Sequence, residues 1–160
     1  MNSAVHPPVT ECHSNLLLAA LPSQEMARML PMLDQVRVEA GQVLCEAGDP
    51  IEHIYFPHDC LVSLLGVAEG RMTLEVGQVG REGMLGVTSA LGHDTTQVRA
   101  VVQRAGNASR MDGARFRSEV ERNPALQKVL YRYTATLLAQ AIQIAVCSRF
   151  HVLEARLARS

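Results

Sequence analysis

Short runs of alternating apolar residues, separated by turns that carry glycine, fill the chain from about residue 34 to residue 111. Val36 and Val38 alternate first, and further runs follow at 54–56, 61–65 and 98–102. Many short strands with turns at intervals of roughly 8–12 residues are typical of an antiparallel sandwich or barrel. A parallel sheet would need crossover helices between its strands, and no segment in this stretch has that pattern. The predicted fold class is therefore mainly β.

The segments that flank the strands have other patterns. Residues 1–13 contain two prolines and no periodicity, which predicts a flexible leader. A compact domain with short helices is predicted over residues 14–122, where Asp112 is a good N-cap for a helix over 113–121. Asn123-Pro124 then starts a long helix, predicted for residues 123–160 together with the start of a hinge, because no glycine or proline follows within it.

The long helix has apolar residues at the spacing of a coiled coil, in steps of four and three. At a rise of about 1.5 Å per residue it reaches about 50 Å, which carries it beyond a small β domain. Its apolar stripe needs a partner, and a second copy of the chain is the one expected. The alternative is that the helix lies across its own strands. The predicted dimer seam consists of Leu126, Leu130, Tyr133, Leu137, Gln140, Ile144 and Cys147.

Composition excludes several classes of protein. The hydrophobic fraction of 48% and the net charge of −1 exclude a largely disordered chain. The 15 basic and 16 acidic residues argue against a broad nucleic-acid-binding face within this stretch. No apolar run of about 18 residues predicts a membrane span, and the first residues lack the basic start of a signal peptide. Four scattered cysteines without a CxxC pair predict reduced thiols and a cytoplasmic protein.

Motifs for catalysis are missing as well. The sequence has no Gly-x-Ser-x-Gly, no His-Glu-x-x-His and no phosphate-binding loop with Lys-Ser/Thr. His53 and His58 lack the His-x-His spacing of metal-binding jelly rolls, so no metal site is expected and the chain is predicted not to be an enzyme. A metal-dependent jelly-roll enzyme stays the less favoured alternative.

The order of short helices, a glycine-punctuated roll and one long helix resembles the sensory half of Crp/Fnr transcription regulators, the cyclic-nucleotide-binding domain family. The resemblance covers about residues 14–159 and depends on three local matches. They are the glycine turns at Gly41 and Gly48, the segment Gly83-Met84-Leu85-Gly86, and Asn123-Pro124. It implies an eight-strand jelly roll, a double-stranded β-helix, followed by a dimerisation helix.

The resemblance also implies where a ligand would bind. The family holds a cyclic nucleotide with a short helix whose amides face the phosphate, an arginine on the phosphate and a glutamate on the ribose. Laid on this sequence without a gap, the glutamate falls on Met84 and the arginine on Asp94. The implied ligand-binding candidates are Gly83, Met84, Leu85, Gly86, Asp94, Thr95, Thr96, and Ala141 and Ile142 on the long helix.

These departures change the expected ligand chemistry. A carboxylate at Asp94 would repel a phosphate where a guanidinium should hold it, and a charge-assisted bond of that kind contributes about 1.5–3 kcal/mol. Binding of cAMP in the usual mode is therefore disfavoured, and the effector is unknown. Arg81 or Arg99 could replace the missing arginine, but strand alternation is expected to send Arg99 to solvent.

The end of the chain bears on its partners. Residues 149–159 look like the hinge that leads to the family's helix-turn-helix, and the sequence stops at Ser160. DNA is an expected partner only where a helix-turn-helix domain is joined to this one. We expect an effector-sensing, dimerising domain of a Crp/Fnr-like regulator; the alternative is a stand-alone dimeric module without an effector.

Overall fold

The computed structural model describes residues 14–69 and 73–158, so the predicted leader over 1–13 lies outside the described residues. Within these residues, seven antiparallel strands form two sheets, with the strand orders β1-β7-β3 and β2-β6-β4-β5. This confirms the mainly β prediction, with one strand fewer in the described ranges than the resemblance implied. The strands are β1 (Asp34–Val38), β2 (Val43–Cys45), β3 (His53–Pro57), β4 (Leu61–Val67), β5 (Thr73–Val79), β6 (Arg99–Arg104) and β7 (Gly106–Asp112).

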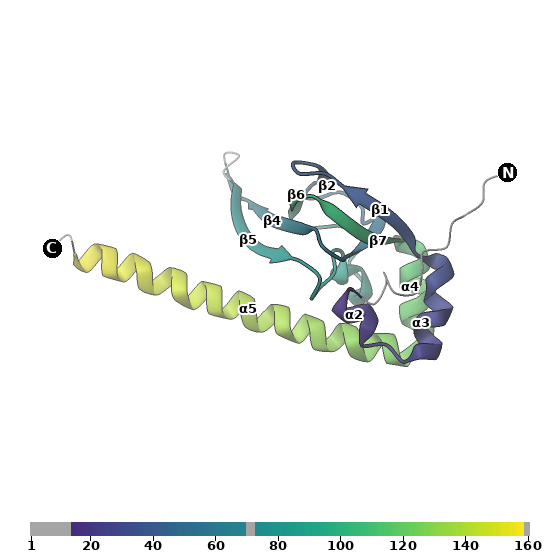
Figure 1. Cartoon of the computed structure of the whole chain (residues 1–160). Helices are drawn as coiled ribbons and strands as arrows, with labels where there is room; N and C mark the ends of the chain where they lie inside the picture. The colour runs from purple at the N-terminus through teal and green to yellow at the C-terminus, as the bar shows by residue number, and fades with distance from the viewer. Residues whose placement is uncertain (1–13, 70–72, 159–160) are drawn as a thin grey trace.

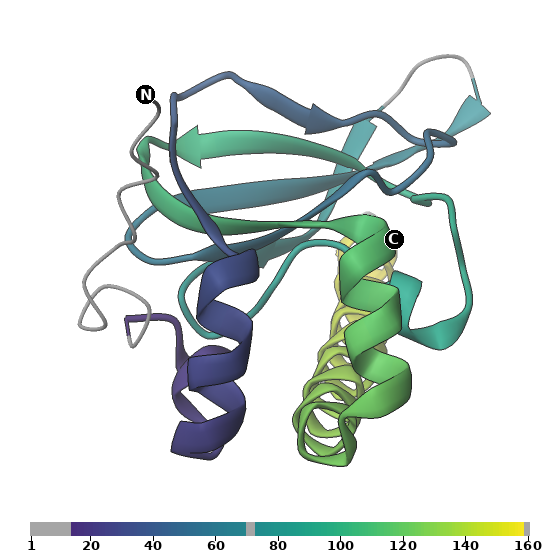
Figure 2. The same cartoon turned by 90° about the vertical axis from the view of Figure 1, so that its right-hand side faces the viewer.

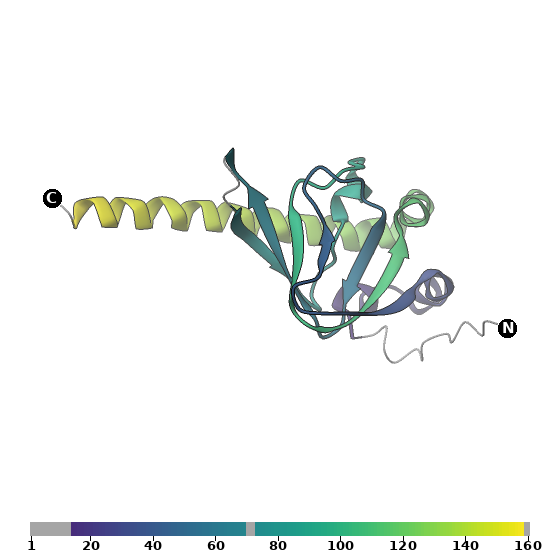
Figure 3. The same ribbon diagram turned by 90° about the horizontal axis from the view of Figure 1, so that it is seen from above.

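Helices cover one side of this roll (Figure 1). In Figure 2, α3 and α4 stand side by side beneath the sheets, with α5 behind α4. Seen from above, α5 runs past the roll and continues well beyond it (Figure 3). The helical segments are α2 (Leu16–Ala19), α3 (Ser23–Met29), η1 (Leu30–Met32), η3 (Val87–Leu91), α4 (Gly113–Arg122) and α5 (Pro124–Leu157). The 34-residue α5 confirms the long helix expected from the absence of glycine and proline.

Alternation along the strands divides the apolar residues between two cores. In β3, Ile54 and Phe56 belong to a cluster shared with the helices, whereas Tyr55 between them belongs to the cluster inside the roll. In β7, Met111 and Ala108 are divided in the same way. Because successive side chains of a strand point to opposite faces, one sheet can pack on the helices and on the second sheet at once.

Two turns of the roll need glycine. Gly41 and Gly48 have φ of 85° and 90°, in the left-handed region that residues with a Cβ rarely adopt. Both turns lie where the sequence pattern placed them, before and after the short strand β2.

Side-chain caps start the C-terminal helices. The Asp112 carboxylate accepts a hydrogen bond from the Arg115 amide at 3.0 Å, which confirms the predicted N-cap of α4. The Asn123 side-chain oxygen accepts from the Leu126 amide at 3.0 Å, and Pro124 occupies the first position of α5. Proline is favoured there because the first helical amides have no partner within the helix.

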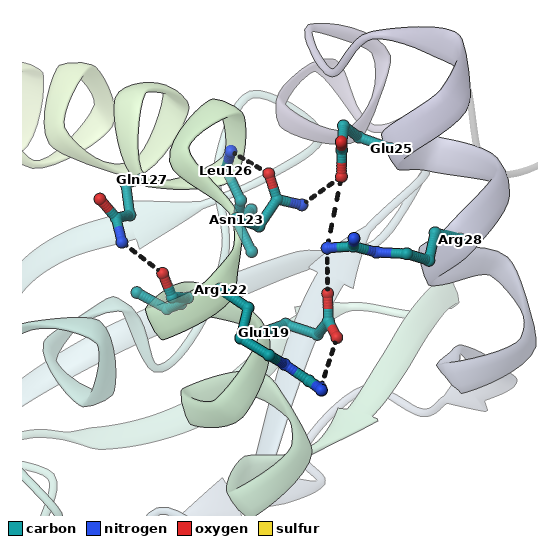
Figure 4. Close-up of polar contacts among 8 residues, drawn as sticks. Glu25, Arg28, Glu119, Arg122, Asn123, Leu126 and Gln127 are labelled. Carbon is teal, nitrogen blue, oxygen red and sulfur yellow. Dashed lines mark hydrogen bonds and ion pairs between the residues drawn. The ribbon is translucent and has the colours of Figure 1, made fainter.

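A polar cluster joins α3, α4 and the start of α5 (Figure 4). The Glu119 carboxylate, which is only 5% exposed, accepts from Arg28 at 3.1 Å and from Arg122 at 3.0 Å. Asn123, itself buried, donates to Glu25 at 2.7 Å. The three helices are therefore held together by a buried carboxylate and a buried amide with their charged partners, as well as by the apolar core.

The first half of α5 packs on the chain's own roll, which corrects part of the predicted dimer seam. Leu126, Leu130 and Tyr133 are 2%, 2% and 8% exposed in the cluster shared with the helices, and Leu137 packs against that cluster. Residues this deeply buried have no surface left for a second copy. For this half of α5, the alternative to dimerisation applies: the helix lies across its own strands. Gln140, Ile144 and Cys147, further along α5, are exposed.

Candidate ligand-binding site

The segment between β5 and β6, residues 83–96, is here called the cassette. Its first part forms an antiparallel bridge with β3. The Leu85 amide donates to the Tyr55 carbonyl at 2.8 Å, and the Tyr55 amide donates to the Leu85 carbonyl at 3.2 Å. A five-residue 3₁₀ helix follows over Val87–Leu91. The amides of Gly83 and Leu85 are thus used by the backbone, since that of Gly83 donates to Gly80 at 3.1 Å.

Gly86 has to be glycine at its position. Its φ is 100°, and a Cβ added there would lie 2.6 Å from the Ile54 Cδ1 atom. The cassette backbone therefore approaches β3 more closely than a residue with a side chain would permit.

The start of the cassette is bonded to two helices. The Tyr133 hydroxyl on α5 donates to the Met84 carbonyl at 3.2 Å, and Asn15, the N-cap of α2, donates to the Gly83 carbonyl at 2.9 Å. Met84, only 2% exposed, is a core residue rather than a ligand contact. Burial raises the pKa of the Tyr133 phenol, so the hydroxyl keeps its proton and the hydrogen bond.

The end of the cassette pairs with the segment 48–51. The Asp94 carbonyl accepts from the Ile51 amide at 2.8 Å, while the Asp94 and Thr95 residues are exposed. Thr96 is buried, and its hydroxyl donates to the Val98 carbonyl at 2.9 Å.

A cavity of about 330 Å³ lies between the cassette, β2 and the segment 49–55. This volume is at the lower end of the range of about 300–1,000 Å³ in which small ligands usually bind. The lining residues are Leu44, Cys45, Asp49, Pro50, Ile51, Glu52, His53, Tyr55, Leu85, Gly86 and Thr96.

The charged groups at this cavity are acidic. Asp49 and Glu52 line it, and no lysine or arginine of the described residues does. Arg99 bonds Glu46 at 3.1 Å instead, and Arg81 is exposed and lines a different cavity. Neither arginine is therefore placed to hold an anion in the cavity beside the cassette. Burial raises the pKa of the Cys45 thiol, so this wall of the cavity adds no thiolate charge near neutral pH.

The sequence-derived candidates are only partly brought together. Leu85, Gly86 and Thr96 line the cavity; Gly83 and Met84 lie behind it, against α5. Asp94 is exposed and does not line it, so the carboxylates that oppose an anion are Asp49 and Glu52 rather than Asp94. Ala141 and Ile142 are exposed on α5 and do not reach the cavity within this chain.

Sequence reasoning missed Tyr55, Asp49 and Glu52. The signal for Tyr55 was its position between the core residues Ile54 and Phe56 of one strand, which puts its side chain on the opposite face. Nothing in the sequence pattern indicated that the turn 48–52 closes over the cassette.

Metal binding and membrane contact are two further possibilities for this chain. No group of three or more His, Cys, Asp or Glu side chains that could hold a metal ion occurs in the described ranges. Within Pro124–Ala155, one helix is long and apolar enough to cross a membrane by length and composition, and its most apolar stretch is unburied. The expectation of a cytoplasmic protein without membrane contact stays a prediction.

Comparison with known proteins gives the family. A model of the cyclic nucleotide-binding domain matches residues 35–123, more than half of the chain. No curated protein matches. Among solved structures, the c-di-GMP-responsive regulator CLP of Xanthomonas campestris is similar at a TM-score of 0.67 and 16% identity, over 78% of this chain and 63% of that one. The N-terminal domain of a transcriptional regulator of Streptomyces coelicolor has a TM-score of 0.60 at 18% identity, over 80% and 89%.

Eukaryotic proteins share the fold. The regulatory subunit of a cAMP-independent protein kinase A from Trypanosoma brucei, a mutant bound to cAMP, has a TM-score of 0.66 at 15% identity, over 81% of this chain and 50% of that one. This chain thus spans less than two thirds of both CLP and the trypanosome subunit. From its family match and its roll with a C-terminal helix, the chain belongs to the cyclic nucleotide-binding domain family, with the fold of a Crp/Fnr-type sensory domain.

Proposed function

We propose that this chain is the effector-sensing and dimerising module of a Crp/Fnr-type transcription regulator, acting by allostery rather than by catalysis. The observation that carries the proposal is the direct bond between cassette and helix. Leu85, which lines the cavity, follows Met84, whose carbonyl is held by Tyr133 of α5. A ligand that moves the cassette must therefore break or rearrange a contact of the helix, and a ligand can shift an equilibrium only through such differential contacts.

The sensing cavity does not take cyclic nucleotides in the family's usual mode. Supporting this, the lining carries Asp49 and Glu52 and, within the described residues, no guanidinium or ammonium group. The Gly83 and Leu85 amides are also occupied by backbone carbonyls.

Calorimetry with cAMP, cGMP and c-di-GMP tests this point. We expect no binding at micromolar concentrations of any of the three. Micromolar binding of cAMP, abolished in a Gly86→Val variant, would refute the ligand part of the proposal and leave the sensory role standing.

Dimerisation uses a different face of α5 from the one first expected. Residues 133–148 contain no charged side chain, and every residue of α5 from 138 to 155 is exposed. Leu138 and Ile142 are 62% and 57% exposed, so this apolar surface needs a cover. Leu138 and Ile142 belong to a second set of residues at heptad spacing on α5. This set lies roughly a third of a turn around the helix from the face that packs on the roll. The corrected dimer seam proposed here consists of Tyr131, Ala135, Leu138, Ile142, Ala145 and Val152, with Arg149 at the heptad position between the last two.

Analytical ultracentrifugation separates the two seams. We expect the Ile142→Asp variant to sediment as a monomer, because a carboxylate would be buried at the corrected seam. Ile144→Asp is the matched control: it is also exposed on α5, but it lies on the side of Gln140 and Cys147, and it should remain a dimer. A monomeric Ile144→Asp variant with a dimeric Ile142→Asp variant would restore the first seam.

Liposome flotation tests whether the exposed apolar part of α5 contacts a membrane instead of a second copy of the chain. Flotation of the wild-type chain with vesicles of neutral lipid, with no dimer in solution, would refute dimerisation and favour a membrane contact. DNA is a partner only where a helix-turn-helix domain is joined after α5, and DNA binding by a chain that carries such a domain tests this step.

A further inference from the structure

We propose that the cavity beside the cassette binds a small cationic ligand with an apolar body, a primary amine rather than a phosphate-bearing one. The inference rests on the proposed sensory function and names its ligand class. It is carried by two independent features of the cavity, an accessible hydroxyl without a partner among the described residues and the sign of the charge at the rim.

The first feature is Tyr55. Its side chain lines the cavity and is only 9% exposed, and no hydrogen bond joins its hydroxyl to any group in the described part of the chain. The hydroxyl oxygen itself is not buried, so a molecule that enters the cavity can reach it. The β3 backbone that carries Tyr55 is fixed by its paired bonds with Leu85. The phenol is therefore held in place with a donor and an acceptor left for a ligand.

The second feature is the charge. Asp49 and Glu52 are exposed at the rim, and neither carboxylate forms an ion pair with a described residue. The neighbouring Glu46, by contrast, is paired with Arg99 at 3.1 Å. Two unpaired carboxylates beside a partly enclosed cavity attract cations and repel anions.

The remaining wall sets the shape of the ligand. Leu44, Ile51 and Leu85 supply apolar surface, and His53 also lines the cavity. The volume of about 330 Å³ leaves room for one aromatic ring or a short aliphatic chain with its ammonium group at the carboxylates. The three positions together describe an amine with an apolar tail.

The probes that test this are phenethylamine and 3-phenylpropionate, which share an apolar ring and differ in the sign of the charge. NMR titration of the ¹⁵N-labelled protein reports binding at each residue and shows whether each variant is folded. We expect phenethylamine to shift the amide signals of the cassette and of residues 49–55, and 3-phenylpropionate to shift neither.

The variants assign the contacts. The double variant Asp49→Asn/Glu52→Gln should weaken phenethylamine binding about fivefold, which corresponds to the upper end of the range for an exposed ion pair. Tyr55→Phe should weaken it about threefold to tenfold through the lost hydrogen bond. Glu46→Gln, the matched carboxylate outside the cavity, should leave the affinity unchanged.

Three outcomes would overturn the inference. They are equal or tighter binding of 3-phenylpropionate, unchanged phenethylamine binding by both cavity variants, and no binding of phenethylamine at all. None of them bears on the proposed sensory role, which is tested by the bond between the cassette and α5 and by the oligomeric state.

Discussion

The contact between Gly83 and Tyr133 gives the sharpest test of how the cassette is joined to α5. A Cβ added at Gly83 would lie 3.0 Å from Tyr133 Cε2, 2.9 Å from Cζ and closer still to the hydroxyl oxygen. Tyr133 is buried and cannot turn away without losing its bond to the Met84 carbonyl. Gly83→Ala therefore combines overpacking with the loss of a buried hydrogen bond.

The expected size follows from these two parts. Overpacking of a well-packed core costs about 1–3 kcal/mol. The lost hydrogen bond costs about 1 kcal/mol. We expect Gly83→Ala to lower the free energy of unfolding by about 2–4 kcal/mol, and Tyr133→Phe alone by about 1–2 kcal/mol, because the Met84 carbonyl is left without a partner.

The double variant gives the coupling energy between the two substitutions. In Gly83→Ala/Tyr133→Phe the phenol oxygen, the atom nearest to the new methyl group, is gone. The two losses should therefore sum to less than their separate values, with a coupling energy of about 1 kcal/mol or more.

Urea unfolding followed by circular dichroism measures all four proteins, since the chain has no tryptophan. Gly77→Ala is the matched control, because a Cβ at Gly77 would meet only Leu64 Cδ1, at 3.8 Å. Additive losses, or a Gly83→Ala variant as stable as Gly77→Ala, would refute a direct contact between cassette and helix.

Three further predictions concern the rest of the fold. Asp112→Ala should lower the free energy of unfolding by about 1 kcal/mol, because α4 loses its N-cap. The hydrogen bond from the helix amide lowers the pKa of Asp112, so the cap is present at neutral pH and is lost in acid. The stabilities of the wild-type protein and the variant should therefore converge as the pH is lowered. Glu119→Ala should cost about 2 kcal/mol in a chemical melt, because Arg28 and Arg122 both donate to this buried carboxylate, whereas Glu121→Ala should change little. Burial raises the pKa of the Cys60 thiol, so the thiol loses its proton at a lower pH in the unfolded state than in the folded state. The free energy of unfolding should therefore fall as the pH rises past the ordinary thiol value of 9.0, and it should fall less between pH 8 and pH 10 in Cys60→Ala.

The turns and the helix boundaries could be predicted from the sequence because they depend on local chemistry. Gly41 and Gly48 marked left-handed turns, Asp112 marked a helix start, and the absence of glycine and proline after Asn123-Pro124 marked the long helix. Each of these features depends on residues close together in the chain, where backbone conformation and hydrogen bonding follow directly from residue type.

Side-chain direction and helix orientation needed the tertiary structure. A heptad pattern predicts an apolar stripe but not its partner, and Leu126 and Leu130 are buried in the chain's own core instead of a dimer seam. An ungapped match placed Asp94 at the phosphate position, yet its carboxylate is exposed outside the cavity that Asp49 and Glu52 border. The physical reason is the same in both cases: sequence spacing determines which residues share a face, whereas packing between distant segments determines what that face meets.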